Sequence, residues 1–281
     1  MSLALQPRSL VEAVRMLGEH PELRPVAGCT DMMVCEREDR ADMAAVIDLL
    51  GIDELRGVRS NEGWLEIGAT TTFAEIRRAP QVRAEFPALA AAAEVVGGWQ
   101  IQNRATLGGN MANASPAGDS LPVLLALDAR VVLVSSAGER EIAYRDFHLG
   151  YRQTALAPGE LIGWVRLPQP PPGCYQFFRK IGTRQAQSIS KVVIALVGSC
   201  EQGRIRDYRL AAGSVAATPI RFSAVEEAVI GRELDAALAA VAGRLAAAAV
   251  EPIDDVRSTA SYRRFVLERV VEQMTADLAF I

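Results

Sequence analysis

The sequence has few of the residues that build metal sites or catalytic triads. Only two histidines occur among its 281 residues, His20 and His148, and neither lies near a matching cluster of ligands. A protein-bound metal or a histidine-based triad therefore has little support. The four cysteines are scattered, and no pair has the two-residue spacing of a zinc or redox site. Cys29 and Cys35 would need distant ligands to hold an iron–sulfur cluster, so buried free thiols are the better interpretation.

An excess of positive charge and long apolar runs are also missing. The formal net charge of -4 and the pI near 5.4 argue against a general nucleic-acid binder. No apolar run reaches the roughly eighteen residues that a membrane-spanning helix needs. The opening "MSLALQPRSLVEAVRML" lacks a basic segment followed by an apolar core and a cleavage site. We therefore expect no membrane insertion and a cytoplasmic location.

What is present is enough apolar sequence, 50% of the chain, for a sizeable core in two or more units. Leu10, Val14 and Leu17 fall on one face of a predicted helix, and strands are expected at 24–28 and 43–49. A hairpin follows at 55–69, then helices at 71–79 and 87–96. A short buried helix at 121–128 and strands at 129–136 and 160–168 close this half, whose subdomains we expect at about 1–55 and 56–170.

The best domain boundary is "LPQPPPG", because four prolines in seven residues cannot extend a helix or a strand ladder. We expect the cut near Pro171, giving domains 1–170 and 171–281. Beyond it, strands at 174–181, 190–201 and 203–215 predict a meander. Thr218 is expected to cap a helix with Pro219 at its first position, and residues 234–250 to form a packed helix. The helical spacing of the last segment includes Tyr262, Phe265, Val266, Arg269, Val270 and Met274.

Two glycine-containing stretches are candidates for ligand binding. "VAGCTD", from Val26 to Asp31, follows a predicted strand, where successive amides and a threonine hydroxyl would surround an anion. A structural turn explains this stretch about as well. "ATLGGNMANASPAGD", from Ala105 to Asp119, is a poor helix and a poor strand by composition, and it would offer exposed amides. Neither has G-x-G-x-x-G or a P-loop lysine, so the pair suggests a long ligand bound by a different fold.

Four segments in order carry a family resemblance: "VAGCTD", "IQNRATLGGNMANASPAGD", "RKIGTRQAQSISKVVIAL" and "AAGSVAATPIRFSAVEEAVIG". Together they resemble the FAD-binding medium subunit of the molybdenum hydroxylases, the xanthine dehydrogenase and aerobic carbon monoxide dehydrogenase family. The resemblance covers nearly the whole chain. It implies an α+β protein whose N-terminal FAD-binding half has two α/β subdomains of the PCMH/VAO type. A C-terminal antiparallel sheet with helices would follow.

The resemblance also implies which residues contact FAD, with no catalytic residue and no metal ligand in this chain. Amides near Gly28 and the Thr30 hydroxyl would face the pyrophosphate, and Asp119 would hydrogen-bond a sugar or ribityl hydroxyl. Ile162 would pack on a ring face, and Lys180 would lie near the accessible side of the flavin. The full set is Pro25, Val26, Ala27, Gly28, Cys29, Thr30, Asp31, Met32, Val96, Gly97, Thr106, Leu107, Gly108, Gly109, Asn110, Asp119, Ile162 and Lys180.

Some of these positions have alternative interpretations, and some depart from the family pattern. Asp119 would otherwise cap a helix beginning near Ser120, and Lys180 would otherwise be a solvated cation at a strand end. Cys29 stands where many relatives have a glycine. Relatives often carry acidic residues and alanine in the loop where this chain has Gln185, Gln187, Ser188 and Ser190. That difference leaves NAD, oxygen, a quinone and a carrier protein open as electron acceptors.

The implied function is electron transfer. A large molybdenum subunit would oxidise the substrate, a small subunit with [2Fe-2S] clusters would pass the electrons on, and this chain would transfer them from FAD to an external acceptor. The usual assembly would be a dimer of heterotrimers. Two alternatives stay open: a self-sufficient flavin oxidase or dehydrogenase, and a non-catalytic assembly module with the same fold.

Overall fold

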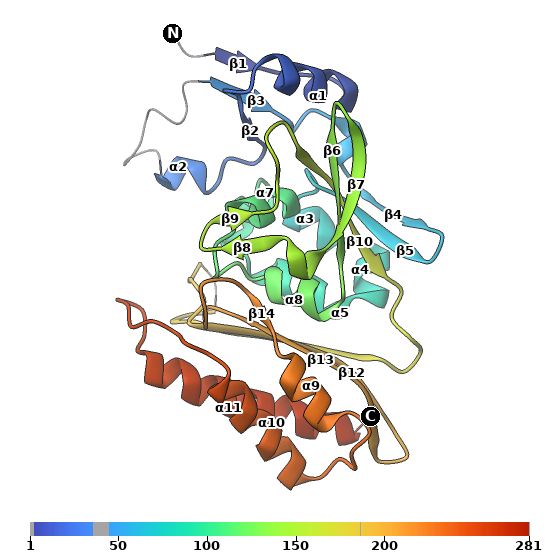
Figure 1. Ribbon diagram of the computed structural model, residues 1–281, viewed down its shortest axis with the longest axis vertical. Coiled ribbons are helices and arrows are strands. Elements are labelled where there is room, and N and C mark those ends of the chain that lie inside the picture. Colours follow the sequence, from blue (N-terminus) through green and yellow to red (C-terminus); the bar gives the residue numbers. More distant parts are fainter. Residues whose placement is uncertain (1–2, 36–44, 186, 281) are drawn as a thin grey trace.

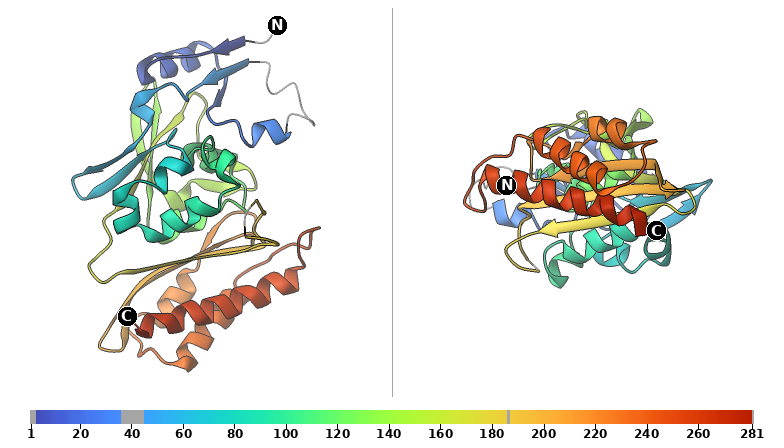
Figure 2. Two further views of the ribbon diagram at one scale, coloured as in Figure 1. Left: turned by 180° about the vertical axis from the view of Figure 1, so that it is seen from behind. Right: turned by 90° about the horizontal axis from the view of Figure 1, so that it is seen from below.

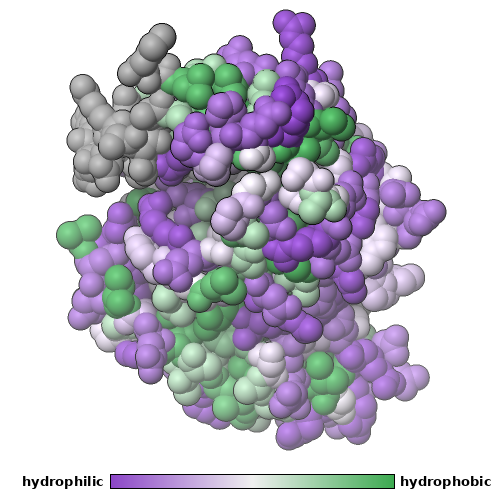
Figure 3. All heavy atoms as spheres, turned by 45° about the horizontal axis from the view of Figure 1, so that its top comes forward, coloured by the Kyte–Doolittle hydropathy of each residue, from purple (hydrophilic) through white to green (hydrophobic). Residues whose placement is uncertain are grey.

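The computed structural model describes residues 3–35, 45–185 and 187–280 (Figure 1). The first two residues of the strand predicted at 43–49 lie outside this description, as does the side chain of Cys35. No helix among the described residues combines the length and apolar composition needed to cross a membrane. One face of the molecule carries hydrophilic and hydrophobic residues intermixed over its surface (Figure 3).

The N-terminal unit is a small parallel sheet with one helix, as the sequence predicts. Strands β1 (Leu3–Leu5), β3 (Ala45–Asp48) and β2 (Arg24–Val26) pair in that order. Helix α1 (Leu10–Glu19) begins after Ser9, whose hydroxyl accepts from the Glu12 amide. The unit's core joins the next sheet, because Ala13, Leu17 and Ile47 cluster with buried valines of β6. The short helices α2 (Met32–Cys35) and η2 (Asp53–Leu55) complete this region.

The second unit is built on a five-stranded antiparallel sheet. Its strand order is β4 (Val58–Asn61), β5 (Trp64–Gly68), β10 (Leu161–Pro168), β6 (Arg130–Ser135) and β7 (Gly138–Ala143). The helices are α3 (Phe73–Ile76), α4 (Pro80–Glu85), α5 (Pro87–Val95), α6 (Trp99–Gln102), α7 (Leu107–Asn113), α8 (Leu121–Ala126) and η3 (Tyr144–Asp146). A small hairpin of β8 (His148–Gly150) and β9 (Gln153–Thr154) lies beside them (Figure 1). Helices α5 and α8 contact the C-terminal sheet.

The C-terminal unit is an antiparallel sheet covered by helices on one face. β11 (Tyr175–Ile181), β12 (Val192–Glu201), β13 (Arg204–Gly213) and β14 (Ile220–Arg221) pair in sequence order. Helices α9 (Ser223–Val229), α10 (Ala236–Ala248) and α11 (Ala260–Asp277), with η4 (Leu278–Phe280), lie across the face that points away from the second unit (Figure 2). The meander predicted from the sequence is therefore present.

The long strand β12 contributes to two cores at once. Successive side chains of a strand point to opposite faces of its sheet. Ala195 and Val197 accordingly belong to the core of the second unit, whereas Ile194 and Leu196 belong to the core beneath α9–α11. All four side chains are fully buried. The C-terminal sheet thus packs against hydrophobic cores on both of its faces.

One expectation for the C-terminal region is wrong. Thr218 and Pro219 do not start a helix, because Ile220 and Arg221 pair with β13 as strand β14. The helix starts only at Ser223, with Phe222 as its N-cap residue. The last predicted helix is present as α11, where Met274 is buried and Phe265 is 60% exposed.

Candidate functional site

The first glycine stretch forms a turn between β2 and α2. The backbone amides of Gly28, Cys29 and Thr30 donate no hydrogen bond to any residue that the structure describes. Cys29 has φ 58°, in the left-handed region, which turns successive amides toward one side of the chain. Residues 27–30 are half-buried. The sequence prediction of an amide-lined turn is consistent with this geometry.

The backbone conformation at Cys29 is one that glycine adopts more readily than other residues. A side chain in the left-handed region is strained, and glycine is not. The Cys29 thiol donates to the Ala27 carbonyl at 3.4 Å. Burial raises the pKa of this thiol, and the Asp48 carboxylate adds to the rise, whereas Arg104 opposes it. The thiol is therefore held in its protonated, less reactive form.

The second glycine stretch is a helix rather than an open loop at its centre. Thr106 caps α7, and its hydroxyl accepts from the Gly109 amide at 3.1 Å. The Leu107 amide donates to the Thr71 carbonyl, and the Gly108 amide donates to the Ala69 carbonyl at 2.9 Å. The expectation of exposed amides is therefore wrong for Leu107, Gly108 and Gly109, whose amides are hydrogen-bonded within the fold. The helix ends at Ala114, which has φ 48°.

Gly108 is required by packing. A methyl group there would lie 2.7 Å from the Ala69 side chain and 2.8 Å from the Ala69 carbonyl oxygen. Gly28 is packed more tightly still, since a methyl group on it would lie 1.9 Å from the carbonyl oxygen of Arg104. The two glycine stretches are therefore in backbone contact through Gly28 and the residue just before Ala105. Gly109, by contrast, is exposed.

Downstream of α7, Asp119 and Lys180 form a buried ion pair between the two halves of the chain. The Lys180 ammonium lies 2.6 Å from Asp119 Oδ2, and both side chains are 8% exposed. Lys180 also donates to the Val95 carbonyl at the end of α5, at 2.9 Å. The Ser190 hydroxyl donates to Asp119 Oδ1 at 2.5 Å. Burial raises the pKa of the Asp119 carboxyl, while the ammonium and the hydroxyl oppose that rise.

This network excludes the two alternative interpretations, Asp119 as a helix cap and Lys180 as a solvated cation. Asp119 does not cap the helix at Ser120, because α8 has no side-chain cap and both carboxylate oxygens have other partners. Lys180 is not a solvated cation, because it is buried at the end of β11. The two residues that the resemblance assigned to one cofactor, 61 positions apart, are in direct contact.

Other predicted contacts lie just after α5 or in the core of the second unit. Val96 and Gly97 follow α5 directly, and the Gly97 carbonyl accepts from the Gln187 amide at 3.3 Å. Ile162 is 6% exposed in β10 and belongs to the core of the second unit. Leu107 is fully buried in the same core. The changed loop at Gln187 thus touches the segment that follows α5.

Gln102 is a residue that the sequence analysis missed. Its side-chain amide donates to the Glu94 carbonyl at 2.8 Å, one residue before the carbonyl that Lys180 binds. Its Oε1 atom is buried and has no partner within the described part of the chain. An unpartnered buried acceptor is costly unless a ligand or water completes it. In the sequence, the one signal that pointed to Gln102 was its position within the segment "IQNRATLGGNMANASPAGD", which carries the family resemblance.

The hairpin β8–β9 joins the two glycine stretches from outside. Arg152 donates to Asn113 Oδ1 of α7 at 2.7 Å and lies 3.7 Å from the Asp31 carboxylate. Asp31 is the last residue of the first stretch and Asn113 lies in the second, so the Arg152 guanidinium contacts both glycine stretches. Beneath it, the Tyr144 hydroxyl lies 2.9 Å from His148 Nε2. Burial lowers the pKa of His148 to about 4.

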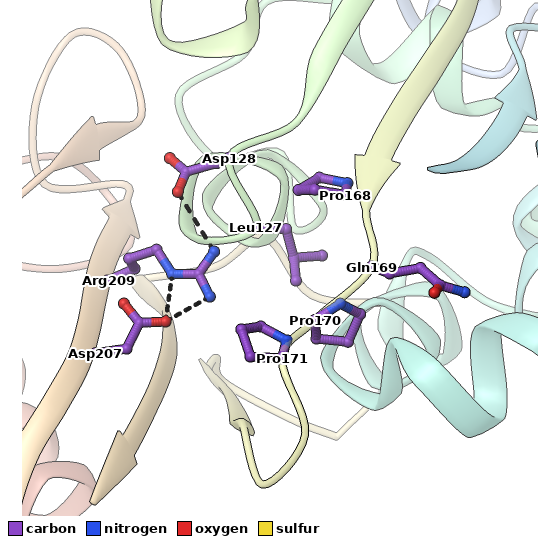
Figure 4. Close-up of a pocket in the computed structure, with 8 residues that line it drawn as sticks. All are labelled: Leu127, Asp128, Pro168, Gln169, Pro170, Pro171, Asp207 and Arg209. Carbon is purple, nitrogen blue, oxygen red and sulfur yellow. Dashed lines mark hydrogen bonds and ion pairs between the residues drawn. The ribbon is translucent and has the colours of Figure 1, made fainter. Parts of the chain in front are cut away.

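The structure also has a cavity away from these residues, at the junction of the two halves. It has a volume of about 320 Å³ and is lined by Leu127, three prolines and a short chain of charged groups (Figure 4). Arg209 lies between Asp128 and Asp207 there, so the polar groups pair with one another. None of the predicted cofactor contacts lines it. Within the described ranges there is also no cluster of potential metal ligands.

Comparison with known proteins defines the class to which this fold and site belong. Residues 2–170 match the family model for the FAD binding domain in molybdopterin dehydrogenase. Residues 177–278 match the model for the CO dehydrogenase flavoprotein C-terminal domain. The chain therefore belongs to the FAD-binding flavoprotein subunits of the molybdenum hydroxylase family, which are components of oxidoreductases.

Particular relatives resemble the chain over most of its length. The glyceraldehyde dehydrogenase medium chain of Sulfolobus acidocaldarius is 29% identical over 275 residues, 98% of this chain and 97% of that protein. The nicotinate dehydrogenase FAD-subunit of Eubacterium barkeri is 32% identical over 235 residues, 81% and 79% of the two chains. A carbon monoxide dehydrogenase structure from Hydrogenophaga pseudoflava matches with a TM-score of 0.94 at 28% identity, covering 99% of this chain and 97% of that one.

Proposed function

We propose that this chain holds FAD and passes electrons from the [2Fe-2S] clusters of a partner subunit to an external acceptor. The observation that carries the proposal is the row of amides at Gly28, Cys29 and Thr30, which donate to none of the described residues and lie in backbone contact with the segment that leads into α7. Unbonded successive amides are a suitable site for an anionic group such as a pyrophosphate. The buried, unpartnered Gln102 Oε1 atom also fits a site that a ligand completes.

In this proposal the predicted contacts divide by role. The turn from Pro25 to Met32 binds the pyrophosphate, and Thr106 to Asn110 position that turn through α7. Asp119, held in place by Lys180 and Ser190, accepts a hydrogen bond from a sugar or ribityl hydroxyl. Val96, Gly97 and Ile162 border the ring system and exclude water from it. When bound, FAD supplies the ability to accept electrons singly and release them in pairs.

We further propose that the chain divides near Pro171 into an FAD-binding domain, residues 1–170, and a C-terminal domain, residues 171–281. The first would contain subdomains at about 1–55 and 56–170. Two features support this: the prolines between β10 and β11, and the separate sheets before and after them. A cytoplasmic location belongs to the same proposal, since Cys29, Cys174 and Cys200 are free thiols, as a reducing compartment would keep them.

The proposed partners are a small iron–sulfur subunit and a large molybdenum subunit, assembled as a dimer of heterotrimers. Support comes from relatives named as a medium chain or an FAD-subunit. Purification of the tagged chain from its own cells should then recover two further subunits, with iron and molybdenum in the complex. Recovery of the chain alone, able to reduce FAD with a substrate by itself, would favour a self-sufficient dehydrogenase instead.

The first test is the visible absorption spectrum of the purified chain before and after FAD is added. We expect two flavin bands and about one FAD per chain. Gly109→Leu should abolish FAD retention while the far-ultraviolet circular dichroism shows that the chain is still folded, because Gly109 is exposed and a β-carbon there meets only the Thr106 hydroxyl, at 2.9 Å. Gly18→Leu, on the exposed side of α1, is the matched control. Undiminished flavin in folded Gly109→Leu would refute this placement.

A further inference from the structure

Arg104 occupies the position where the two glycine stretches meet. Its carbonyl oxygen is the atom against which Gly28 packs. Its own amide donates to the Ile101 carbonyl at 2.9 Å, which fixes the backbone just before Ala105 and the cap of α7. The backbone of Arg104 is thus held firmly against the amide-lined turn.

The Arg104 side chain, in contrast, is exposed. Its guanidinium makes no hydrogen bond and no ion pair with any residue in the described ranges. Its charge opposes the rise in the pKa of the Cys29 thiol that burial and Asp48 cause. Together with the backbone contact between Arg104 and Gly28, this places the guanidinium near the turn that carries the three amides.

The other charges near this turn do not favour a bound anion. Asp31 and Asp48 contribute carboxylates at the two ends of the region. Arg152 is already engaged with Asp31 and with Asn113 of α7. The first amides of α7 are used by the fold, so they supply little positive potential.

We propose that the guanidinium of Arg104 binds the pyrophosphate of FAD and makes the site prefer the dinucleotide over riboflavin, which lacks phosphate. This inference rests on the proposed function. A guanidinium donates two parallel hydrogen bonds to phosphate oxygens, and it balances charge that neutral amides only partly offset. Arg104 is the residue that supplies a full positive charge where Asp31 and Asp48 would otherwise repel the cofactor.

The test is the affinity of the flavin-free full chain for FAD and for riboflavin, measured by quenching of flavin fluorescence. Arg104→Gln should weaken FAD binding about 10- to 100-fold, the usual effect of losing a hydrogen bond to a charged group. Riboflavin binding should be unchanged. Arg104→Lys should recover part of the lost affinity. Arg78→Gln is the matched control and should bind FAD as the unaltered chain does, because it removes another exposed arginine whose side chain pairs with none of the described residues.

Salt dependence gives a second measurement that does not require riboflavin to bind. FAD affinity of the unaltered chain should fall as ionic strength rises, and the slope should flatten in Arg104→Gln because one charge contact is gone. Equal FAD affinity and equal salt slope in the variant and the unaltered chain would overturn the inference but leave the proposed function standing. Failure of the unaltered chain to bind FAD would overturn both.

Discussion

The two glycine stretches look alike in sequence but differ in what their backbones do. The first, Val26 to Asp31, has three successive amides that donate to none of the described residues. The second, Ala105 to Asp119, uses the amides of Leu107, Gly108 and Gly109 to begin a helix and to pair with Thr71 and Ala69. The difference teaches that glycine composition alone does not indicate which amides the fold leaves unused.

The largest change in stability is expected at the ion pair between Asp119, at the end of the second stretch, and Lys180 in the C-terminal half. Lys180→Met should lower the free energy of unfolding by about 3 kcal/mol, because it leaves the Asp119 carboxylate buried without its counterion. Urea unfolding monitored by circular dichroism measures this. The double variant with Asp119→Asn should recover much of the loss. Arg15→Met, which breaks the exposed pair with Glu19, should cost about 0.5 kcal/mol or less, and a similar loss in Lys180→Met would contradict the prediction.

The comparison itself is tested by adding one methyl group to each stretch. Gly108→Ala should lower the free energy of unfolding by about 2 kcal/mol, because the new methyl group meets the backbone of Ala69 inside the core. Gly28→Ala makes a closer contact, 1.9 Å from the Arg104 carbonyl oxygen, at a half-buried turn. We therefore expect at least as large a loss of stability, together with a large loss of FAD affinity, whereas folded Gly108→Ala should lose less of its FAD affinity. An equal loss of FAD affinity in the two folded variants would mean that the two stretches do not differ as described.

Acidification should act through the hairpin that contacts both stretches. The pKa of His148 is about 4 in the folded chain and 6.5 ordinarily, because burial disfavours its charged form. The unfolded chain therefore takes up a proton first as pH falls below about 6.5, and stability is lost progressively toward pH 4. Between pH 7 and pH 4.5 the loss should be on the order of 2 kcal/mol. His148→Gln should flatten this pH dependence in urea unfolding, and an unchanged dependence in that variant would contradict the prediction.

The smallest effect is expected at Cys29. Replacing Cys29 by Gly should raise the free energy of unfolding by about 1 kcal/mol, because φ 58° strains a side chain there. Cys29→Val should lower it, since a β-branched residue tolerates that conformation least. Thermal unfolding of the three proteins gives the order. A loss of stability in Cys29→Gly would mean that the thiol contact with Ala27 outweighs the backbone strain.

Local patterns in the sequence predicted the elements, and they failed where tertiary pairing decides. The helix at Leu10–Glu19, the hairpin at 58–68 and the meander of β11–β13 follow from periodicity and turn residues. The helix expected from Thr218 and Pro219 is wrong because Ile220 and Arg221 find a strand partner. Phe265 shares helical spacing with Met274, but spacing does not say which of two faces meets the sheet.

The site was predictable only in part for the same reason. The family resemblance chose Asp119 and Lys180, but nothing local indicates that they contact each other or that Ser190 joins them. Gly108 and Gly109 are adjacent glycines that the sequence does not distinguish, yet of the two only Gly108 is packed against a neighbouring backbone. Which amides are already bonded depends on Ala69 and Thr71, residues from another part of the chain. Arg104 stands out only when its lack of a partner is seen.

Because β12 contributes to two hydrophobic cores, it affects how the chain unfolds. Ala195 and Val197 complete one core, and Ile194 and Leu196 complete the other. Loss of this strand would expose apolar surface on both sides at once, and hydrophobic burial is the dominant stabilising force in folding. The two halves should therefore melt together in one cooperative transition, even though a proline-rich connection joins them. A cofactor bound to the N-terminal half would raise the melting temperature of the whole chain.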